Sequence, residues 1–468
     1  MHSLPQEPDM MEDHLRIPNK KKRKKSNKKK NGKWVGDKVG REIEDFACYA
    51  TKIHDFSRMA HQAKDSRKRA QIKAPIIFIV VFFGAFFSMV SMAQLDHWLK
   101  SKVFARFIPS RFRLPSHDTV RRALQKWDLD IQRQQHQEIV ICYKEQKGPK
   151  KGSIDGLRVT AIDGVELFHS TAYKCKDCLT REKRDGSTEY YHSIVVAQQV
   201  GGGANIIYDW EMRKPRDGQD KDEGESTVAL RLIKSLKEKY GKITDVYTLD
   251  ALYAKAPIIE AALAAGSHVV IRMKDKRMRI MQRGHKEFSE RSYDHFWEEN
   301  DRRGNSIYVQ AWEQEGLTDW DQVSIPLRLI KIIRHTTKTI IEGNEKVQVT
   351  DITEQWLVTT YTKTEVKVQT IARIACERWE IENVAFRNLK TFNHIDHCFV
   401  HHPVAIEALI NFQVMAFNLK RMYFYHHLSN FRSWDIQLRE VINEMREAAR
   451  WGKLNLCRWL WKWGLCVL

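Results

Sequence analysis

The sequence predicts a mixed α/β fold, a sheet flanked by helices, from two observations. Between residues 157 and 273, apolar runs of β-prone residues alternate with segments that have the helical period. A second, β-rich region follows, with candidate strands at Ser306–Trp312, Pro326–His335, Lys346–Thr350 and Gln355–Thr360. The chain has 468 residues, of which 42% are hydrophobic, so it can bury a large core in two or three structural units.

The first 35 residues are polar and strongly basic. Lys20–Lys30 contains nine Lys or Arg, a block that repels itself and cannot build a core, so we expect residues 1–35 to form a disordered tail. The formal net charge of +20 favours a polyanionic partner, because clustered cations bind phosphates by releasing counterions. A non-specific DNA-binding arm, a nuclear import signal and a merely solvated tail all fit the block. Its candidate DNA-binding residues are Lys20, Lys21, Lys22, Arg23, Lys24 and Lys25.

Residues 36–150 are predicted to be a helical, DNA-binding domain. Ala74–Ala93 runs without a charge and is long enough to cross a bilayer, with basic residues before it. Because Gly84 and two serines interrupt it, we favour a core helix buried on all sides, with a membrane segment as the alternative. Further on, a helix is expected to start at Ser116 and to carry an apolar face that extends to Ile131. It would be either a recognition helix or a packing helix.

The main α/β domain is placed at residues 151–425, after a turn-rich linker at 148–156. Its β-rich insertion covers about residues 274–370, and a C-terminal helical region covers 426–468. The elements expected ahead of the insertion are the strands Leu157–Ile162, His192–Val200, Asn205–Met212, the strand ending at Asp250, and His268–Met273, and the helices Ser226–Tyr240 and Ala256–Ala265.

Two of these strands end on a carboxylate. Asp163 follows VTAI and Asp250 follows VYTL, so each lies where a buried strand opens to solvent. A third acidic stretch, Arg378–Lys390, is predicted to be helical. In it Arg378 and Glu382 share a face, while Glu380 is turned roughly 200° away from Glu382 at about 100° per residue.

Three oxygen ligands from distant parts of a chain suit Mg²⁺ or Mn²⁺, which are hard cations that also bind phosphate oxygens. In this order and context, the three stretches resemble the DDE transposases of bacterial insertion sequences. The resemblance spans about residues 66–425, and Arg378 and Glu382 match two positions of a helical signature of that family. The Tyr and Lys positions of the signature are Ala375 and Leu389 here, with Lys390 one residue late.

The resemblance implies an RNase H-like mixed sheet in which Asp163, Asp250 and Glu382 are catalytic and bind two Mg²⁺ or Mn²⁺ ions, with Asp163 shared between the ions. It also implies cleavage and strand transfer at the ends of an insertion sequence, with Arg378, Arg387 and Lys390 contacting the DNA. The expected partners are double-stranded DNA and a second copy of the chain in the DNA complex. A bacterial, cytoplasmic, nucleoid-associated protein without a membrane span is the expectation, and an inactive or membrane-anchored DNA-binding protein of this fold is the alternative.

Eight cysteines in a chain of this length do not indicate a disulfide framework, so a reducing cytoplasm is expected. Cys175 and Cys178 form a single CxxC, which would need two further ligands to hold zinc. A cluster after the acidic helix could supply them, and it consists of His394, His397, Cys398, His401 and His402. The alternative is a pair of surface cysteines and a partly buried, histidine-rich turn.

Overall fold

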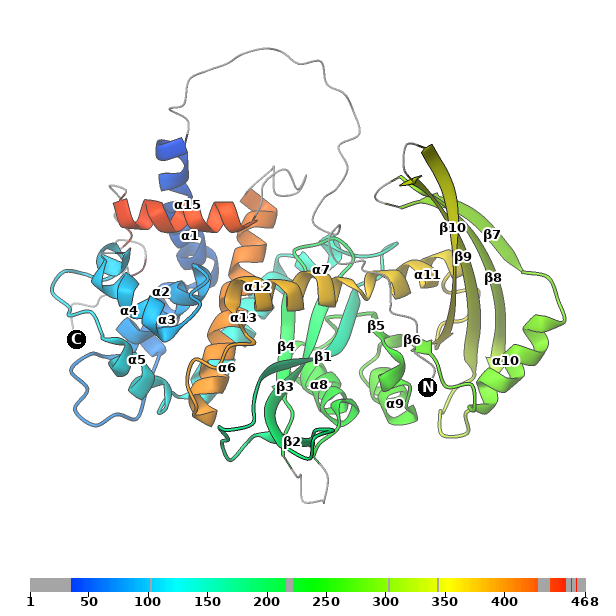
Figure 1. Ribbon diagram of the computed structural model, residues 1–468, viewed down its shortest axis with the longest axis horizontal. Coiled ribbons are helices and arrows are strands. Elements are labelled where there is room, and N and C mark those ends of the chain that lie inside the picture. Colours follow the sequence, from blue (N-terminus) through cyan, green and yellow to red (C-terminus); the bar gives the residue numbers. More distant parts are fainter. Residues whose placement is uncertain are drawn as a thin grey trace, which may run out of the picture.

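The computed structural model describes residues 35–460 apart from 102, 216–221, 302–303, 343–344, 428–437, 452–455 and 457–459. The basic block at 20–30 lies outside these residues. The described part has an all-helical end, a central sheet with helices on both faces, and a β-rich end (Figure 1).

The helical end comes mainly from the N-terminal part of the chain. Its elements are α1 (Val35–His54), α2 (Phe56–Gln62), α3 (Ala74–Phe86), α4 (Met92–Lys100), η1 (Val103–Arg106), α5 (His117–Leu124), α6 (Leu129–Glu145) and α7 (Gly148–Lys151). Two helices from the other end of the chain, α13 (Pro403–His427) and α15 (Leu438–Trp451), pack against this group.

Helix α3 is the centre of that group. All 13 of its residues, Ala74–Phe86, are buried, and Phe82 and Phe83 pack among other aromatic rings. A helix of this length spans only about 20 Å, less than the roughly 30 Å apolar layer of a bilayer. The core-helix prediction is confirmed. None of the helices in the described ranges has the length and apolar character needed to span a membrane.

The helix predicted from Ser116 to Ile131 is divided in two in the structure. The Ser116 hydroxyl caps α5 as expected, accepting from the N–H of Thr119 at 3.3 Å. The chain then turns at Trp127, and the Asp128 carboxylate caps α6 by accepting from the N–H of Ile131. The apolar spacing continues across this break because both helices face the same core.

The central sheet contains five strands in the order β4-β3-β1-β5-β6, in which β1, β3 and β4 are antiparallel neighbours and β5 and β6 run parallel to β1. Three antiparallel strands followed by two parallel ones, with helices on both faces, is the RNase H-like arrangement. These strands are β1 (Val159–Ser170), β3 (Thr188–Val200), β4 (Ile207–Met212), β5 (Val246–Leu249) and β6 (His268–Met273), and the short β2 (Leu179–Glu182) pairs with the start of β3.

Helices cover the two faces of the sheet (Figure 1). On one face lie α8 (Glu225–Tyr240) and α9 (Ala256–Ala264), with η2 (Ala251–Tyr253) after β5. Across the other face run α11 (Val368–Glu377), the π-helix η3 (Ile381–Phe386) and α12 (Arg387–Asn393). The apolar side chains form two cores, one on each side of the sheet.

Antiparallel strands extend the sheet beyond β6. They are β7 (His295–Asn300), β8 (Ser306–Leu317), β9 (Leu327–Glu342) and β10 (Glu345–Thr359), preceded by α10 (Arg279–Ser289). Strand β10 pairs with β6, so these strands continue the central sheet. The strands predicted at Lys346–Thr350 and Gln355–Thr360 are one continuous strand, because Asp351–Glu354 also pairs with β9.

Candidate active site

Register places Asp163 and Asp250 side by side. Strands β1 and β5 are parallel, and their last aligned pair is Ile162 with Leu249, so each aspartate directly follows this pair. Asp250 follows the end of β5 as predicted, whereas Asp163 lies within β1, which continues to Ser170 because it also pairs with β3. Neighbouring strands lie roughly 4.8 Å apart. Side chains alternate between the faces of a sheet, so Asp163 shares the face of Ala161, in the core beneath α11 and η3.

The third carboxylate approaches from the helices on this face. Arg378 follows α11, and its guanidinium lies 3.0 Å from Asp163 Oδ2 and 3.0 Å from Glu382 Oε1. The Arg378 side chain is 6% exposed, so one buried cation joins the first strand to the helix. Glu382 lies in a π-helical segment, a distortion that is frequent at functional sites.

Glu380 points elsewhere, as the helical spacing predicted. Its carboxylate accepts from the backbone N–H of Gly201 at 2.7 Å and from the Asn205 side chain at 3.1 Å. The acidic helix is therefore fixed to the turn after β3 by Glu380, while Glu382 is left on the side of Asp163.

Asp163 is poorly solvated for a carboxylate. Burial raises its pKa to about 7; Arg378 opposes this shift, and Glu382 adds to it. The backbone N–H of Gly164 also favours the ionised form, donating to Oδ1 at 2.9 Å. A multivalent cation at this position would favour the carboxylate far more strongly than one arginine does.

Asp250 has an oxygen without a protein partner. Its Oδ1 is buried and accepts no hydrogen bond in the described part of the chain, while Oδ2 lies 3.8 Å from the Lys274 ammonium. A buried, unpaired carboxylate oxygen is costly unless something binds it. The donor set of hard oxygens beside Asp163 fits a divalent cation.

A fourth carboxylate that the sequence analysis did not single out lies at the same end of the sheet. Glu225 begins α8, and a Cβ on Gly164 would come within 2.3 Å of its Oε2. The Tyr253 hydroxyl donates to that oxygen at 3.2 Å. Burial, Asp163, Glu225 and Asp250 all raise the pKa of Tyr253 well above its usual range, which reflects how closely these acids surround it. An acidic residue at a helix start was the available signal.

Comparison with known proteins identifies the region that carries these residues. Residues 206–419 match the family model described as "Transposase DDE domain". This part of the chain is similar to the transposase DDE domain family. The match includes Asp250 and Glu382, whereas Asp163 lies before its first residue. No curated protein matches the chain significantly.

One solved structure similar to this chain is the piggyBac transposase synaptic complex with hairpin DNA, determined by cryo-electron microscopy. The identity is 11% and the TM-score is 0.42, with 92% of this chain and 79% of that chain covered. DDE transposases in general use divalent metal ions.

The carboxylates of Asp163, Asp250 and Glu382 are not in mutual contact. In the described ranges, Cys175, Cys178 and His192 form the one group of three or more possible metal ligands whose atoms all lie within 4.8 Å of one another. Asp163, Asp250 and Glu382 are not such a group, and the Arg378 guanidinium lies between the first and the third.

The remaining candidate DNA contacts differ in their surroundings. Arg387 is partly buried and Lys390 is exposed on α12, one and two turns beyond Glu382. Lys20, Lys21, Lys22, Arg23, Lys24 and Lys25 lie outside the described residues. Ala375, at the Tyr position of the family signature, is on the buried side of α11.

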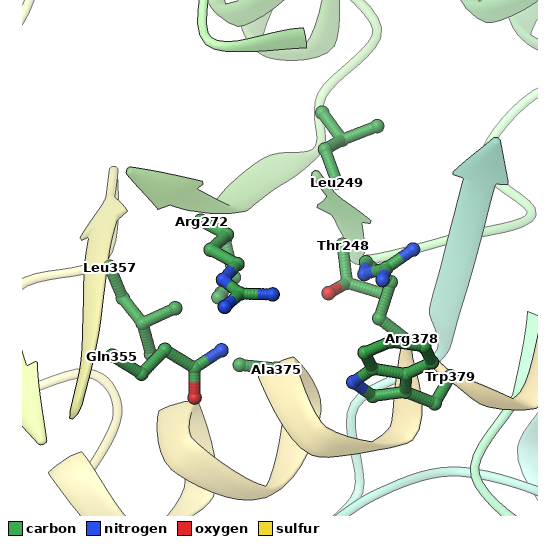
Figure 2. Close-up of a pocket in the computed structure, with 9 residues that line it drawn as sticks. Thr248, Leu249, Arg272, Gln355, Leu357, Ala375, Arg378 and Trp379 are labelled. Atoms are coloured by element: carbon green, nitrogen blue, oxygen red, sulfur yellow. The ribbon is translucent and has the colours of Figure 1, made fainter. Parts of the chain in front are cut away.

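A small pocket lies on the α11 face and is lined by Leu249, next to Asp250, and by Arg378, which contacts Asp163 and Glu382 (Figure 2). Arg272 from β6 and Arg378 point into it, and the indole of Trp379 forms one wall. Trp379 is 40% exposed, and Leu252, two residues after Asp250, is 53% exposed. Exposed apolar side chains, the buried Arg378 and the half-buried Arg272 thus lie near the same carboxylates.

Proposed function

We propose that the chain is the transposase of an insertion sequence, which cleaves DNA at the element's ends and joins these ends to a target. The observation that carries the proposal is the alignment of Asp163 with Asp250 on parallel strands, with Glu382 connected to Asp163 through Arg378. The match to the transposase DDE domain supports the same role.

Asp163, Asp250 and Glu382 would hold two divalent cations, Mg²⁺ or Mn²⁺. When bound, such ions would polarise the scissile phosphodiester and lower the pKa of an attacking oxygen. The unpartnered Oδ1 of Asp250 and the desolvated carboxyl of Asp163 supply the hard ligands. Arg378 orients two of the three carboxylates before the DNA binds.

The chemistry has two balanced steps. In the first, the oxygen of a water molecule bonds to phosphorus, the bond from phosphorus to the 3′ oxygen breaks, and a 3′-hydroxyl and a 5′-phosphate result. In the second, the released 3′-hydroxyl attacks a phosphate of the target, displaces a target 3′ oxygen, and gives up its proton. One carboxylate-lined site serves both steps because each displaces a 3′ oxygen at a phosphodiester.

The charge of the protein suits this substrate. The net charge of +20 favours DNA binding, and Arg272, Arg378 and the exposed Trp379 lie next to the carboxylates. An exposed indole beside a cleavage site can stack on a base unpaired at a DNA end. Because two ends of the element must be joined together, the chain should act as a dimer on DNA. Mass photometry with duplexes that carry the element's end would detect this dimer.

The test uses the purified chain and duplex oligonucleotides copied from the DNA that flanks its coding sequence on both sides. With Mg²⁺ or Mn²⁺, we expect cleavage at the element's end, and with pre-cut duplexes we expect joining to a supercoiled plasmid. Chelation with EDTA should abolish both reactions. Binding without cleavage or joining in either metal would support the alternative, an inactive DNA-binding relative.

A further inference from the structure

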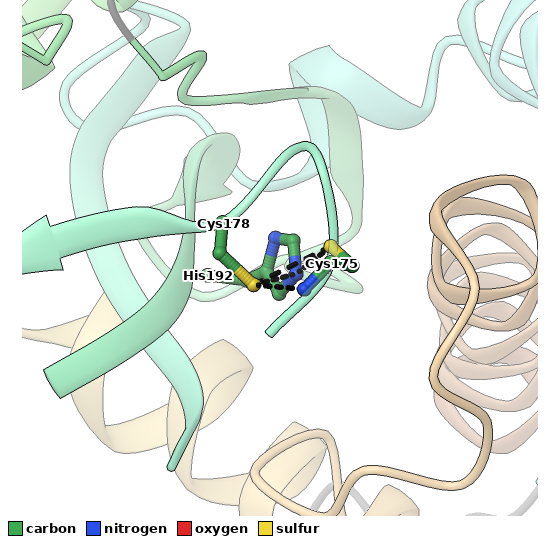
Figure 3. Close-up of side chains that lie close together, drawn as sticks. All are labelled: Cys175, Cys178 and His192. Carbon is green, nitrogen blue, oxygen red and sulfur yellow. Dashed lines mark hydrogen bonds between the residues drawn. The ribbon is translucent and has the colours of Figure 1, made fainter. Parts of the chain in front are cut away.

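A second group of possible metal ligands lies away from the carboxylates. Cys175 Sγ lies 3.2 Å from His192 Nε2, Cys178 Sγ lies 3.5 Å from the same nitrogen, and the two sulfurs are 3.4 Å apart (Figure 3). These three atoms form a nearly equilateral triangle. In a tetrahedral zinc site, bonds of about 2.3 Å to sulfur and 2.0 Å to nitrogen separate the ligand atoms by roughly 3.5 to 3.8 Å.

The local backbone holds the triangle in place. Cys175 and Cys178 close a turn between β1 and β2, in which the Cys178 N–H donates to the Cys175 carbonyl at 3.3 Å. The N–H of Cys175 donates to Cys178 Sγ at 3.1 Å, which fixes the position of that sulfur. The two sulfurs are therefore directed to one point without being bonded to each other, and both thiols are free.

His192 comes from a different element and is tightly held. It lies on β3 and is 2% exposed, with its ring 5.4 Å from that of Phe168. Its Nδ1 is buried without a hydrogen-bond partner in the described part of the chain. Nε2 is thus the nitrogen that faces the sulfurs, and a strand of the central sheet supplies the third corner.

A fourth ligand is available across the same cavity. The cavity is lined by Cys175, Cys178, His192, Cys398 and His401. Cys398 is half-buried in the segment between α12 and α13, and its Sγ lies 3.5 Å from His401 Nδ1. His401 is exposed and packs on the Tyr173 ring at 5.1 Å, which leaves Cys398 as the ligand and His401 as its hydrogen-bond partner.

We propose that Cys175, Cys178, His192 and Cys398 form a structural zinc site. Three thiolates and one imidazole are a common structural zinc set, and soft sulfur ligands select zinc over Mg²⁺ or Mn²⁺. The site would connect the turn before β2 and strand β3 to the segment that follows α12. It would thereby hold the end of the helical stretch that carries Glu382 against the sheet. The site stands independently of the proposed transposase reaction.

The test measures metal in the full chain, purified under a phosphine reductant without added metal. Mass spectrometry of the metals should find about one zinc per chain. Substituting Co²⁺ should give the thiolate-to-cobalt charge-transfer band and the strong visible bands of a tetrahedral site. Cys175→Ser and Cys178→Ser should lose both signals. Cys142→Ser, which removes a thiol on α6, is the matched control and should keep them.

Two further variants test the ligand assignment. Cys398→Ser should lower zinc affinity by at least about tenfold, since loss of outer-shell support alone costs 10-fold or more. His401→Ala should lower it less. Retention of full affinity by Cys398→Ser would overturn the role of Cys398. Cys178→His should bind zinc where Cys178→Ser does not. Its charge-transfer band with Co²⁺ should be weaker, because one thiolate has been exchanged for an imidazole.

If the ligand variants do not fold, the melting temperature of the unmodified chain still tests the proposal. A chelator should lower the melting temperature of the unmodified chain, and Zn²⁺ should restore it whereas Mg²⁺ should not. Absence of zinc and of the cobalt bands in a chain with reduced thiols would overturn the proposal. So would a Cys175–Cys178 disulfide, seen in chain isolated without reductant as two thiols that, in denaturant and chelator, are alkylated only after reduction.

Discussion

Arg378 donates from Nη1 to Oδ2 of Asp163 at 3.0 Å, and this contact joins the helix after α11 to the first strand of the sheet. The same guanidinium lies 3.0 Å from Glu382 Oε1. Burial of one cation between two carboxylates keeps all three groups at fixed positions, because removing either acid would leave a buried charge without its partner. The site is thus organised by the protein alone.

Removing a site carboxylate should abolish DNA cleavage and leave DNA binding intact. For Asp163→Asn and Asp250→Asn we expect the rate of end cleavage in Mg²⁺ to fall by more than about 100-fold. Loss of a residue that only supports a metal ligand lowers activity by about 10- to 100-fold, and loss of the ligand itself should cost more. Glu382→Gln should behave in the same way. Cleavage is followed on labelled duplexes and binding by gel shift at constant salt.

The matched control for these three variants is Asp130→Asn, in the exposed first turn of α6. It removes one carboxylate from the surface and should cleave at the normal rate. Cleavage at near-normal rate by either Asp163→Asn or Asp250→Asn would show that the acids of this sheet edge are structural.

The pH dependence of stability should report the desolvation of Asp163. Its pKa rises from 3.8 to about 7 on folding, so the folded state binds this proton more tightly than the unfolded state does. The resulting stabilisation is complete below pH 3.8 and is lost as the pH rises through about 7, by at most about 4 kcal/mol. Asp163→Asn removes this dependence.

We therefore expect Asp163→Asn, in EDTA, to be more stable than the unmodified chain at pH 8 and similar to it at pH 4. Urea unfolding at both pH values measures the difference, with Asp130→Asn as the reference. Addition of Mg²⁺ at pH 8 should stabilise the unmodified chain and leave Asp163→Asn unchanged. An equal response of both proteins to Mg²⁺ would remove Asp163 from the cation site.

The strands and the two aspartates could be predicted from sequence because each depends on local pattern. The apolar run before Asp250 defines β5, and the run before Asp163 gives the first part of β1, whose extension to Ser170 was not predicted. The helical spacing of Glu380 and Glu382 gives their opposite directions. The register of β1 against β5 depends on pairing between segments about 87 positions apart, from 163 to 250, which no local period encodes. The family resemblance supplied that relationship.

Other features were not predictable because they arise from tertiary contacts. In the sequence, Glu225 looks like an ordinary acidic residue at a helix start. Its closeness to Gly164, which connects it to the site, is seen only in the folded structure. The π-helical segment around Glu382 has no local sequence signal. The break at Trp127 went undetected because the apolar spacing continues through it.

The fold should require glycine at position 164, because a side chain there would meet Glu225. An alanine Cβ there would approach Glu225 Oε2 to 2.3 Å, so Gly164→Ala should destabilise the protein by about 1–3 kcal/mol. Glu225→Ala removes the clash but also the acceptor of the Tyr253 hydroxyl. The double variant should therefore be more stable than the sum of the two single changes predicts, by about 1 kcal/mol or more.

Urea unfolding of the four proteins measures this coupling. Gly186→Ala is a suitable reference for the alanine substitution itself, because nothing lies within 4 Å of a Cβ there, although its positive φ of +78° adds backbone strain. Strictly additive effects of Gly164→Ala and Glu225→Ala would mean that the carboxylate moves away from Gly164 without cost.

Lys420 should weaken the helical core as the pH falls. It is 4% exposed on α13, and its ammonium donates to the Phe86 carbonyl at 3.1 Å at the end of α3. Burial lowers its pKa from 10.5 to about 7, so its contribution to stability is present above pH 10.5 and is lost as the pH falls through about 7. The loss is at most about 5 kcal/mol.

Lys420→Met keeps the length of the side chain and removes the charge. We expect the variant to gain stability relative to the unmodified chain as the pH falls from 10 to 6, although it leaves the Phe86 carbonyl without this donor. Unfolding by urea across that range measures the gain, and Lys234→Met on the exposed side of α8 is the matched control. A difference between variant and unmodified chain that stays constant with pH would mean that Lys420 keeps its charge on folding, with water reaching it inside the helical core.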